Sequence, residues 1–548
     1  MNSYERKKMA YNLVKQNVKK LLPYQIASYL LALTAMINSM FLINLMRLLI
    51  DSFQIGDVDL SLFPSILIFA FLYLILMITY QFVFRRTQIV GHKEVTLMLY
   101  KKLQQKDISF FKKHNSGELI SLINNEGKTV GDWLSQGLLA LLSLSTLAIL
   151  NIMLMAMYNI LIACIIVFIL AIFLLISRRL TTVIAKFSAE SFGLTGKINQ
   201  FILQTLKSVR IIFALNKHDW FFNRFSNLVH NQRYQVDKKK ANFYAVYMAL
   251  FLVLSVMLPI LVVVLGVFLA EAQGISIGVI LAFYALTANM QEPVQYIPDL
   301  LSSRKNAMAL SERLLPIIEN DNADEEEPDM NNLAKIKELT ISSSFFSYHV
   351  DEKPLLVNLE ISLKEKDVLL IKGGSGTGKS TLVELVMGFL RSDSVKISLN
   401  GLDCSAISNK TRWRNILVAD QNPILFEGTI NENIMLGDQY SEEELDDVIY
   451  TACLEHFSSN DNSSRMIGSD EDGVSGGQKQ RISLARMLLR KPDVLIADEP
   501  TSALDNETSS RLAQRLIDFV NKNEIILIIV SHKPDFDEYA TKIVELCD

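Results

Sequence analysis

The sequence predicts a membrane α-helical domain of six transmembrane helices followed by an α/β domain built around a phosphate-binding loop. Half of the 548 residues are hydrophobic, and the long apolar stretches all lie before residue 300. A glycine-rich loop at residues 373–381 stands between an apolar run at 368–371 and a stretch of helical spacing at 382–387. A chain of this length is expected to hold more than one domain. These observations divide the chain into a membrane part and a nucleotide-binding part.

The membrane part is expected at residues 1–320. A membrane helix needs about 20 mostly apolar residues, and one buried core helix does not account for all of the stretches of that length. The six spans are expected at about residues 21–46, 61–84, 133–157, 159–177, 241–270 and 272–298.

The orientation of these spans follows from the distribution of Lys and Arg. These residues concentrate in the N-terminal segment and in the connections at 85–128 and 178–240, whereas the other connections carry none. By the positive-inside rule both termini are expected in the cytosol, in a multi-pass protein of the cell membrane. The two basic connections are too long for simple loops, so we expect helices that leave the bilayer, bend and return. Contact of a solvated basic face with anionic lipid is a partial alternative.

Polar residues inside the spans are candidates for lining a cavity, and ionisable ones are functional candidates by default. Ordinary helix packing, or reaching the interface from a span end, is the competing interpretation, above all for Arg47 and Glu292. The other candidates are Asn38, Asn44, Asn151, Asn289 and Gln291.

An acidic, proline-bearing linker at residues 321–336 is expected to separate the membrane domain from the domain at 337–548. The net charge of -4 gives no reason to expect nucleic acid as a partner. The four cysteines are scattered and fit neither a zinc site nor a disulfide framework.

The loop at residues 373–381 fits the pattern G-x-x-x-x-G-K-[ST]. Glycines let backbone N–H groups turn toward phosphates, and the next helix adds the positive end of its dipole. Lys379 is expected to reach the β- and γ-phosphates, and the Ser380 hydroxyl to bind Mg²⁺. A glycine-rich turn without a ligand is disfavoured because the rest of the chain supplies the partners that this loop needs.

A buried strand predicted at residues 494–499 ends in Asp498 and Glu499. A parallel strand ending beside the glycine loop would place Asp498 at the Mg²⁺ and Glu499 beside the attacking water. Two acids at a strand end are common, so the loop and the acids are specific only together. Tyr348, upstream of the loop, is expected to stack on the adenine ring, with a surface tyrosine as the alternative.

A second loop, at residues 474–481, also places a serine and glycines at the start of a helix, which makes another anion site. One chain does not need two γ-phosphate sites for one ATP. This loop is therefore expected to complete the site of an ATP held by another subunit.

Together these motifs resemble the nucleotide-binding domain of an ABC transporter, a P-loop ATPase, and the membrane part resembles the six-span exporter fold. The resemblance implies ATP and Mg²⁺ as cofactors, with Glu499, His532 and Gln421 as catalytic residues. It implies Ser380, Gln421 and Asp498 as Mg²⁺ ligands. The expected ATP-binding residues are Tyr348, Gly373, Gly374, Ser375, Gly376, Thr377, Gly378, Lys379, Ser380, Thr381, Ser475, Gly476, Gly477, Gln478 and Asp505.

Two positions depart from the family pattern. Val474 stands where the family usually has Leu at the start of the signature motif. Residues 468–473 do not hold the usual exporter sequence, so the resemblance does not establish the details of communication between the two halves of a dimer.

The resemblance implies an ATPase coupled to transport, in a bacterial half-exporter that works as a homodimer, with a heterodimer as the alternative. We expect export of a peptide, such as a modified antimicrobial peptide, with a lipid flippase or multidrug exporter as alternatives. An ATP-gated channel or a ligand-sensing regulatory subunit is the alternative of another class. A soluble P-loop enzyme anchored in the membrane is disfavoured by the signature loop.

Overall fold

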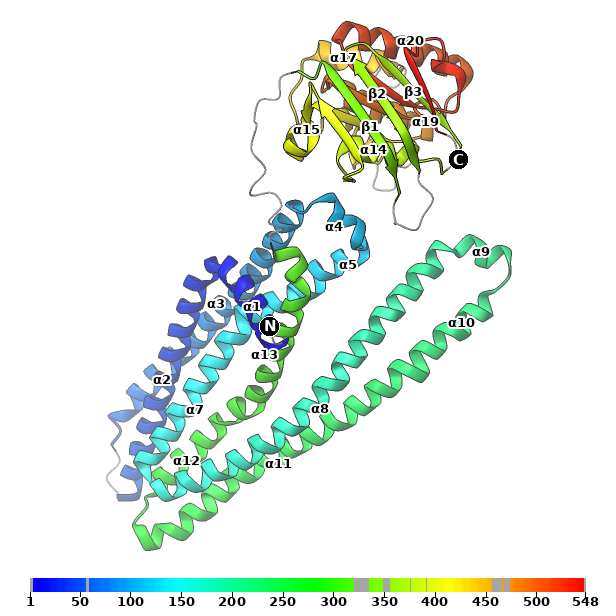
Figure 1. Ribbon diagram of the computed structural model, residues 1–548. Helices are drawn as coiled ribbons and strands as arrows, with labels where there is room; N and C mark the ends of the chain where they lie inside the picture. Colours follow the sequence, from blue (N-terminus) through cyan, green and yellow to red (C-terminus); the bar gives the residue numbers. More distant parts are fainter. Residues whose placement is uncertain are drawn as a thin grey trace. The chain divides into compact units, whose positions relative to one another are not determined.

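The computed structural model describes residues 3–55, 59–319, 335–347, 355–374, 376–390, 392–455, 466–467 and 474–546. The chain forms two compact units, Met1–Asn320 and Asp321–Asp548. The first is helical, and the second is an α/β domain, so the predicted fold class is confirmed (Figure 1).

The first unit is a set of long helices joined by short ones at the bends. Its elements are α1 (Ser3–Asn17), η1 (Lys19–Leu21), α2 (Leu22–Ile55), α3 (Leu62–Gln104), α4 (Ile108–Lys113), α5 (Ser116–Ser121), η2 (Leu122–Glu126), α6 (Gly127–Asp132), η3 (Trp133–Gly137), α7 (Leu138–Tyr158), α8 (Ile160–Lys207), α9 (Val209–Ala214), α10 (His218–Ser226), η4 (Asn227–Arg233), α11 (Tyr234–Gln273), α12 (Ile277–Asn289) and α13 (Gln291–Ile318).

Among the described residues, five helical stretches are long and apolar enough to cross a membrane. They are Lys19–Gln54, Leu62–Gln104, Ser116–Tyr158, Ile160–Lys207 and His218–Ala270. Each contains one of the first five predicted spans. The sixth predicted span, 272–298, is divided between α12 and α13 at Met290. Because α12 has only 13 residues and α13 carries several charged residues, the sixth crossing stays a prediction.

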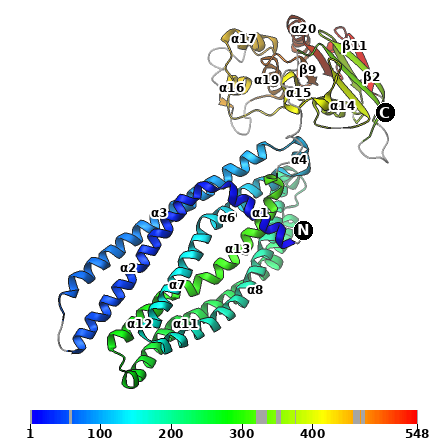
Figure 2. The same ribbon diagram turned by 60° about the vertical axis from the view of Figure 1, so that its left-hand side comes forward.

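The two basic connections continue the membrane helices, as predicted. Helix α3 runs without a break to Gln104, and α8 runs to Lys207 before the chain bends through α9 and α10. Figures 1 and 2 show α8 and α11 side by side along most of their length, with α9 and α10 at the far end.

The interior of the first unit is held by two apolar clusters. One joins α7, α8, α11, α12 and α13 around the fully buried Met155, Ile166 and Leu286. The other joins α1, α3, α6 and α13 around Leu99 and Leu314. Burial of such side chains contributes roughly 1.5–3 kcal/mol each in water, and packing takes over this role where lipid surrounds the helices.

The described part of the second unit is built on two large sheets and a two-stranded sheet of β7 and β8. Its elements are β1 (Glu338–Phe346), β2 (Leu356–Lys364), β3 (Val368–Gly373), α14 (Lys379–Met387), β4 (Val395–Leu399), β5 (Leu402–Asp403), η5 (Cys404–Ala406), α15 (Asn409–Asn415), β6 (Ile416–Ala419), β7 (Gly428–Thr429), α16 (Ile430–Met435), α17 (Glu442–Thr451), β8 (Met466–Ile467), α19 (Gly476–Leu488), β9 (Val494–Asp498), α20 (Asn506–Asn523), β10 (Ile526–Val530), η6 (Pro534–Phe536) and β11 (Lys542–Leu546).

The central sheet is parallel and has the strand order β11-β3-β10-β9-β6. Strand β10 is buried at every residue, as expected for a parallel strand covered on both faces. An antiparallel sheet of order β2-β1-β4-β5 packs against it through shared apolar residues. In the central sheet Val530 pairs with both Ile371 and Asp498, so the strands end at the same level. Everything that follows β3, β9, β10 and β6 therefore gathers at this carboxyl edge.

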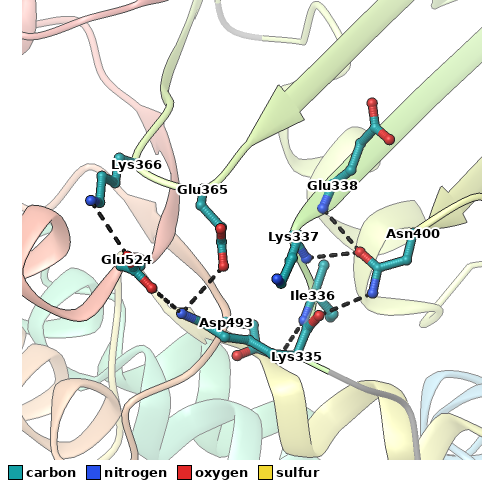
Figure 3. A network of polar contacts seen from close by, with 9 residues as sticks. All are labelled: Lys335, Ile336, Lys337, Glu338, Glu365, Lys366, Asn400, Asp493 and Glu524. Atoms are coloured by element: carbon teal, nitrogen blue, oxygen red, sulfur yellow. Dashed lines mark hydrogen bonds and ion pairs between the residues drawn. The ribbon is translucent and has the colours of Figure 1, made fainter.

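The opposite, amino edge of the central sheet receives the chain where the described part of the second unit begins (Figure 3). The Asp493 carboxylate accepts a hydrogen bond from Ile336 N at 2.8 Å. The Asn400 side chain accepts from Lys337 N and Glu338 N at 2.8 and 3.1 Å, and donates to Lys335 O at 3.0 Å. Side-chain acceptors thus bind three consecutive backbone N–H groups at the entry to β1.

A chain of ion pairs closes this amino edge. Lys335 Nζ lies 2.9 Å from Glu524 Oε2 and 3.3 Å from Glu365 Oε1. Lys366 Nζ lies 3.5 Å from the other oxygen of Glu524. These charges lower the pKa of Glu524, chiefly through its hydrogen bond with Lys335.

Candidate functional site

The glycine loop between β3 and α14 has the backbone that a phosphate cradle needs. Gly376 and Gly378 have φ of +90° and +98°, in the left-handed region that side chains disfavour. Gly378 is the N-cap of α14, so the first turn of this helix, with Lys379, Ser380 and Thr381, begins directly after the loop. Tyr348 and Ser375 lie outside the described residues.

The Lys379 ammonium lies over the glycine loop. Its Nζ donates to Gly373 O at 2.7 Å and to Gly374 O at 2.6 Å. Thr377 Oγ1 donates to Gly374 O at 3.1 Å. The loop therefore holds a positive charge beside its backbone, which suits an oligophosphate.

The three residues predicted to be catalytic lie together at the carboxyl edge. Gln421 Nε2 donates to Glu499 Oε2 at 2.6 Å, and His532 Nε2 lies 3.5 Å from Glu499 Oε1. The Glu499 side chain is 20 % exposed, whereas that of His532 is 52 % exposed. Two polar groups therefore fix a half-buried carboxylate in a defined direction.

The backbone also holds Glu499 in place. Its φ is +49°, a left-handed conformation that costs a non-glycine residue about 1–2 kcal/mol. Glu499 N donates to Val530 O at 2.8 Å, which continues the ladder between β9 and β10 past Asp498. Strain of this kind is kept where the surrounding structure determines the position of one side chain.

The acidic side chains at this edge lie close together, so a cation would stabilise them. Burial raises the pKa of Asp498, and the charges of Glu499 and Asp420 raise it further, against an opposing effect of Lys379. A divalent cation here would stabilise the ionised form of Asp498.

Mg²⁺ fits these residues by the chemistry of their donors. A hydroxyl (Ser380), an amide oxygen (Gln421) and a carboxylate (Asp498) are all oxygen ligands. Within the described ranges, no group of three or more His, Cys, Asp or Glu side chains is placed to hold a metal ion. Mg²⁺ is usually held by one or two protein side chains together with water and phosphate oxygens.

The signature loop is placed on another element, at the start of α19. Ser475 is the N-cap, and it forms a capping box in which Ser475 Oγ accepts from Gln478 N and Gln478 Oε1 accepts from Ser475 N. None of the contacts described for Ser475, Gly476, Gly477 and Gln478 involves residues 373–381. The structure thus assembles one set of predicted ATP-binding residues at the carboxyl edge and a second set elsewhere, as two half-sites require.

The segment 501–505 leads from Glu499 to α20. Asp505 is the N-cap of α20, and its Oδ1 accepts from Thr508 N at 2.9 Å, a bond that lowers the pKa of Asp505. The carboxylate predicted to contribute to ATP binding therefore also has a structural role.

Three side chains near this site were not predicted from the sequence. Gln480 joins Gln421 O to Ser502 Oγ, Lys533 binds the carbonyls of Thr501 and Leu504, and Asp420 lies in the field of Asp498. Each lies within two positions of a predicted site residue in the sequence, and this closeness was the only sequence feature that pointed to it.

In the membrane unit, several predicted cavity residues bind other helices instead. Asn38 Nδ2 donates to Phe69 O at 2.8 Å, and Asn44 Oδ1 accepts from Tyr158 Oη at 3.1 Å. Gln291 Nε2 donates at 3.1 Å to Ser255 O, the carbonyl that Pro259 leaves without its helical N–H. These residues link helices.

The remaining membrane candidates differ in exposure. Arg47 stacks on the Tyr158 ring at 4.9 Å from its centroid. Asn151 is fully buried, and neither atom of its amide has a hydrogen-bond partner among the described residues. Asn289 is half-buried and Glu292 is exposed.

Comparison with known proteins places both units in one family. The model of the ABC transporter transmembrane region matches residues 22–294, and the ABC transporter model matches residues 356–502. A bacterial Atm1-family ABC exporter solved with ATP bound has the same fold, with a TM-score of 0.79 over 96 % of this chain and 94 % of that chain, at 17 % sequence identity.

Similar curated proteins include lipid flippases. The ATP-dependent lipid A-core flippase of Vibrio vulnificus (strain CMCP6) is 26 % identical over 468 residues, covering 83 % of this chain and 78 % of the relative. The flippase of Francisella tularensis subsp. holarctica (strain OSU18) is 26 % identical over 455 residues, covering 81 % and 74 %. An uncharacterized ABC transporter ATP-binding protein of Bacillus subtilis (strain 168) is 24 % identical over 455 residues, covering 81 % and 78 %. These names favour the lipid alternative over the peptide substrate that we expected first.

Proposed function

The chain belongs to the ABC transporter family, as an exporter with its membrane and ATPase domains fused, and we propose that it moves a lipid-like amphiphile outward across a bacterial cell membrane. Coupling of transport to ATP hydrolysis is a property of the family. The names of the flippases from Vibrio and Francisella support a lipid-like substrate without identifying it.

One observation in this chain carries the proposal, and it is the exposed face of α12 and α13. Tyr284 on α12 and Glu292 and Tyr296 on α13 are all exposed, and Glu292 and Tyr296, four residues apart, lie on one side of α13. Tyr284 is 48 % exposed and Tyr296 46 % exposed, whereas Leu286 and Met290 on the other side are buried.

An exposed carboxylate within or beside the bilayer is costly unless it meets water or a polar ligand. We place this face on a water-filled cavity shared by two copies of the chain. Tyrosines and the carboxylate offer hydrogen bonds to a polar headgroup, and the exposed Leu281 of α12 and Leu301 of α13 offer contact to acyl chains. Such a face suits a molecule with both parts.

For hydrolysis we propose two ATP sites between two copies. Lys379, Ser380, Asp498 and Glu499 of one copy would face Ser475 and Gly477 of the other. Glu499 accepts the proton of the attacking water while the bond between the γ-phosphorus and the bridging oxygen breaks, and Gln421 and His532 keep its carboxylate aimed. Ser380, Gln421 and Asp498 would hold Mg²⁺, which would supply positive charge to neutralise the phosphates. Both termini lie on the cytosolic side, where ATP is.

Reconstituted vesicles test the substrate class. The chain is inserted into liposomes that contain a phospholipid with a fluorescent headgroup, and the fraction of label accessible to an external quencher is followed with and without Mg-ATP. We expect ATP to change the accessible fraction in the wild type and to leave it unchanged in Glu499→Gln.

The same vesicles separate the alternatives. ATP-dependent movement of a cationic peptide without movement of lipid would replace the proposal by peptide export. Ion flux that exceeds ATP turnover by orders of magnitude would indicate a channel.

A further inference from the structure

The segment Thr501 to Asp505, between β9 and α20, is bound by side chains from two other elements. Lys533 Nζ donates to Thr501 O at 2.7 Å and to Leu504 O at 3.0 Å. Lys533 directly follows His532, and its own N donates to Ser531 Oγ at 3.0 Å. One half-buried ammonium therefore ties the loop of His532 to two backbone carbonyls of this segment.

Gln480 of α19 holds the same segment from the other side. Its Nε2 donates to Ser502 Oγ and to Gln421 O, both at 3.0 Å. The orientation of the amide is determined, because a backbone carbonyl such as Gln421 O can only accept. The Gln480 side chain is buried, 8 % exposed, and its Oε1 has no partner among the described residues.

The signature loop touches this segment directly. A Cβ added at Gly477 would lie 2.7 Å from Ala503 O and 2.7 Å from Leu504 Cδ2, closer than such atoms approach. Only glycine permits this backbone contact. Any shift of the segment is therefore transmitted to the loop at the start of α19.

The other end of the segment joins the hydrolysis site. Ser502 N donates to Glu499 O at 3.1 Å. One short segment thus contacts the backbone of Glu499, the loop of His532, the residue that binds Gln421 O, and the signature loop.

We propose that Gln480 and Lys533 are positioning residues that couple two half-sites. One is the ATP site formed by this chain, and the other is the signature loop that this chain contributes to the ATP site of its partner copy. The inference rests on the proposed arrangement of two ATP sites between two copies. Neither side chain needs to touch ATP, because each acts through the segment 501–505.

As part of this inference, the segment has a second arrangement in which the buried Oε1 of Gln480 accepts a hydrogen bond. A buried oxygen without a donor is unfavourable, so a state that supplies a donor is favoured. Closure of two copies on ATP would move the segment and offer such a donor. Small displacements at this point matter, because a shift of about 1 Å can cost roughly a hundredfold in rate.

Steady-state hydrolysis by the full-length chain in vesicles tests the inference. Lys533→Met and Gln480→Met remove the donors at similar side-chain size, and Lys533→Arg restores a donor to the carbonyls. Lys522→Met, which breaks only an exposed ion pair with Asp447, is the matched control. For each variant kcat, KM, the Hill coefficient for ATP, nucleotide affinity and the apparent unfolding temperature are measured.

We expect a wild-type Hill coefficient between one and two, two being the number of sites. Lys533→Met and Gln480→Met should lower kcat by about tenfold or more and bring the Hill coefficient to one, with nucleotide affinity changed less than about threefold. Lys533→Arg should recover most of kcat. The double variant should lose less than the product of the single effects, because both act on one segment.

Other outcomes would overturn the inference. A wild-type Hill coefficient of one would mean that the two ATP sites are not coupled, so the inference would fail. Unchanged kcat in both Met variants removes the positioning role, and a loss that parallels unfolding, or that Lys522→Met shares, makes the role structural. No transported substrate enters this assay, so failure of lipid movement and failure of this inference are separate results.

Discussion

Both edges of the central sheet carry acidic and amide side chains, but these side chains have different surroundings at the two edges. At the amino edge, Asp493, Asn400 and Glu524 have their partners within the protein. At the carboxyl edge, Asp498 and Glu499 crowd together, and burial and mutual charge raise the pKa of Asp498. Burial raises the pKa of Asp493 as well, but there the hydrogen bond from Ile336 N and the charge of Lys335 oppose that effect. The difference separates charges that stabilise the fold from charges that we propose to meet ATP and Mg²⁺.

The largest effect is expected at Lys379. Lys379→Met removes the ammonium over the glycine loop but leaves the fold of β3 and α14 intact. Since such a charge stabilises the transferring phosphoryl group, ATP turnover should fall by at least about a hundredfold. The apparent unfolding temperature should change little. If the variant instead lost stability and kept its turnover, the claim that charges at the carboxyl edge do not stabilise the fold would be contradicted.

At the amino edge the opposite result is expected from Asp493→Ala. The change leaves the N–H of the buried Ile336 without its acceptor and should lower stability by about 1–3 kcal/mol. Turnover per folded molecule should stay within about twofold. Asp493→Asn, whose amide oxygen still accepts, is the control, and thermal unfolding with parallel ATPase assays makes the measurement.

Asp498→Asn should stabilise the protein in the absence of nucleotide while abolishing turnover. Because the folded pKa of Asp498 is raised, its favourable contribution is present at low pH and is lost as pH rises through that pKa. The unfolding temperature of the variant should therefore rise relative to that of the wild type as pH increases from about 4 to 7. The difference should reach a few degrees. An equal difference at every pH would contradict the electrostatic account.

The smallest effect is expected from Glu524→Gln. The pKa of Glu524 is lowered by Lys335 and Lys366, so its contribution is present near neutral pH and is lost as pH falls through the folded pKa. Unfolding temperatures at pH 7 should drop slightly in the variant, and the gap should close in about 0.5 M salt. A difference in unfolding temperature that persists in salt would show that packing, and not charge, accounts for the contribution of Glu524.

The sequence allowed the carboxyl edge to be predicted because its signals are local. The glycine loop and the pair Asp498 and Glu499 each occupy a short run, and parallel strands must end side by side. Gln421 and His532 were predicted as catalytic residues from family resemblance, and their contacts with Glu499 come from the structure.

The rest depends on contacts between distant segments. Asp493 binds Ile336 across 157 positions, and Lys533 binds backbone carbonyls, which have no sequence signature. The break at Met290 also escaped prediction, although the polar residues Asn289, Gln291 and Glu292 stand on both sides of it. Backbone partners and helix breaks of this kind are decided by tertiary packing.

Glu499→Gln tests the central claim most directly, because it changes one carboxylate oxygen to an amide nitrogen at the carboxyl edge. Nucleotide binding and ATP turnover are measured on the same purified full-length protein in vesicles. The account predicts retained Mg-ATP binding with turnover reduced at least about a hundredfold, since the group that accepts the proton of water is lost. Turnover at the wild-type rate would contradict it and remove Glu499 from the reaction.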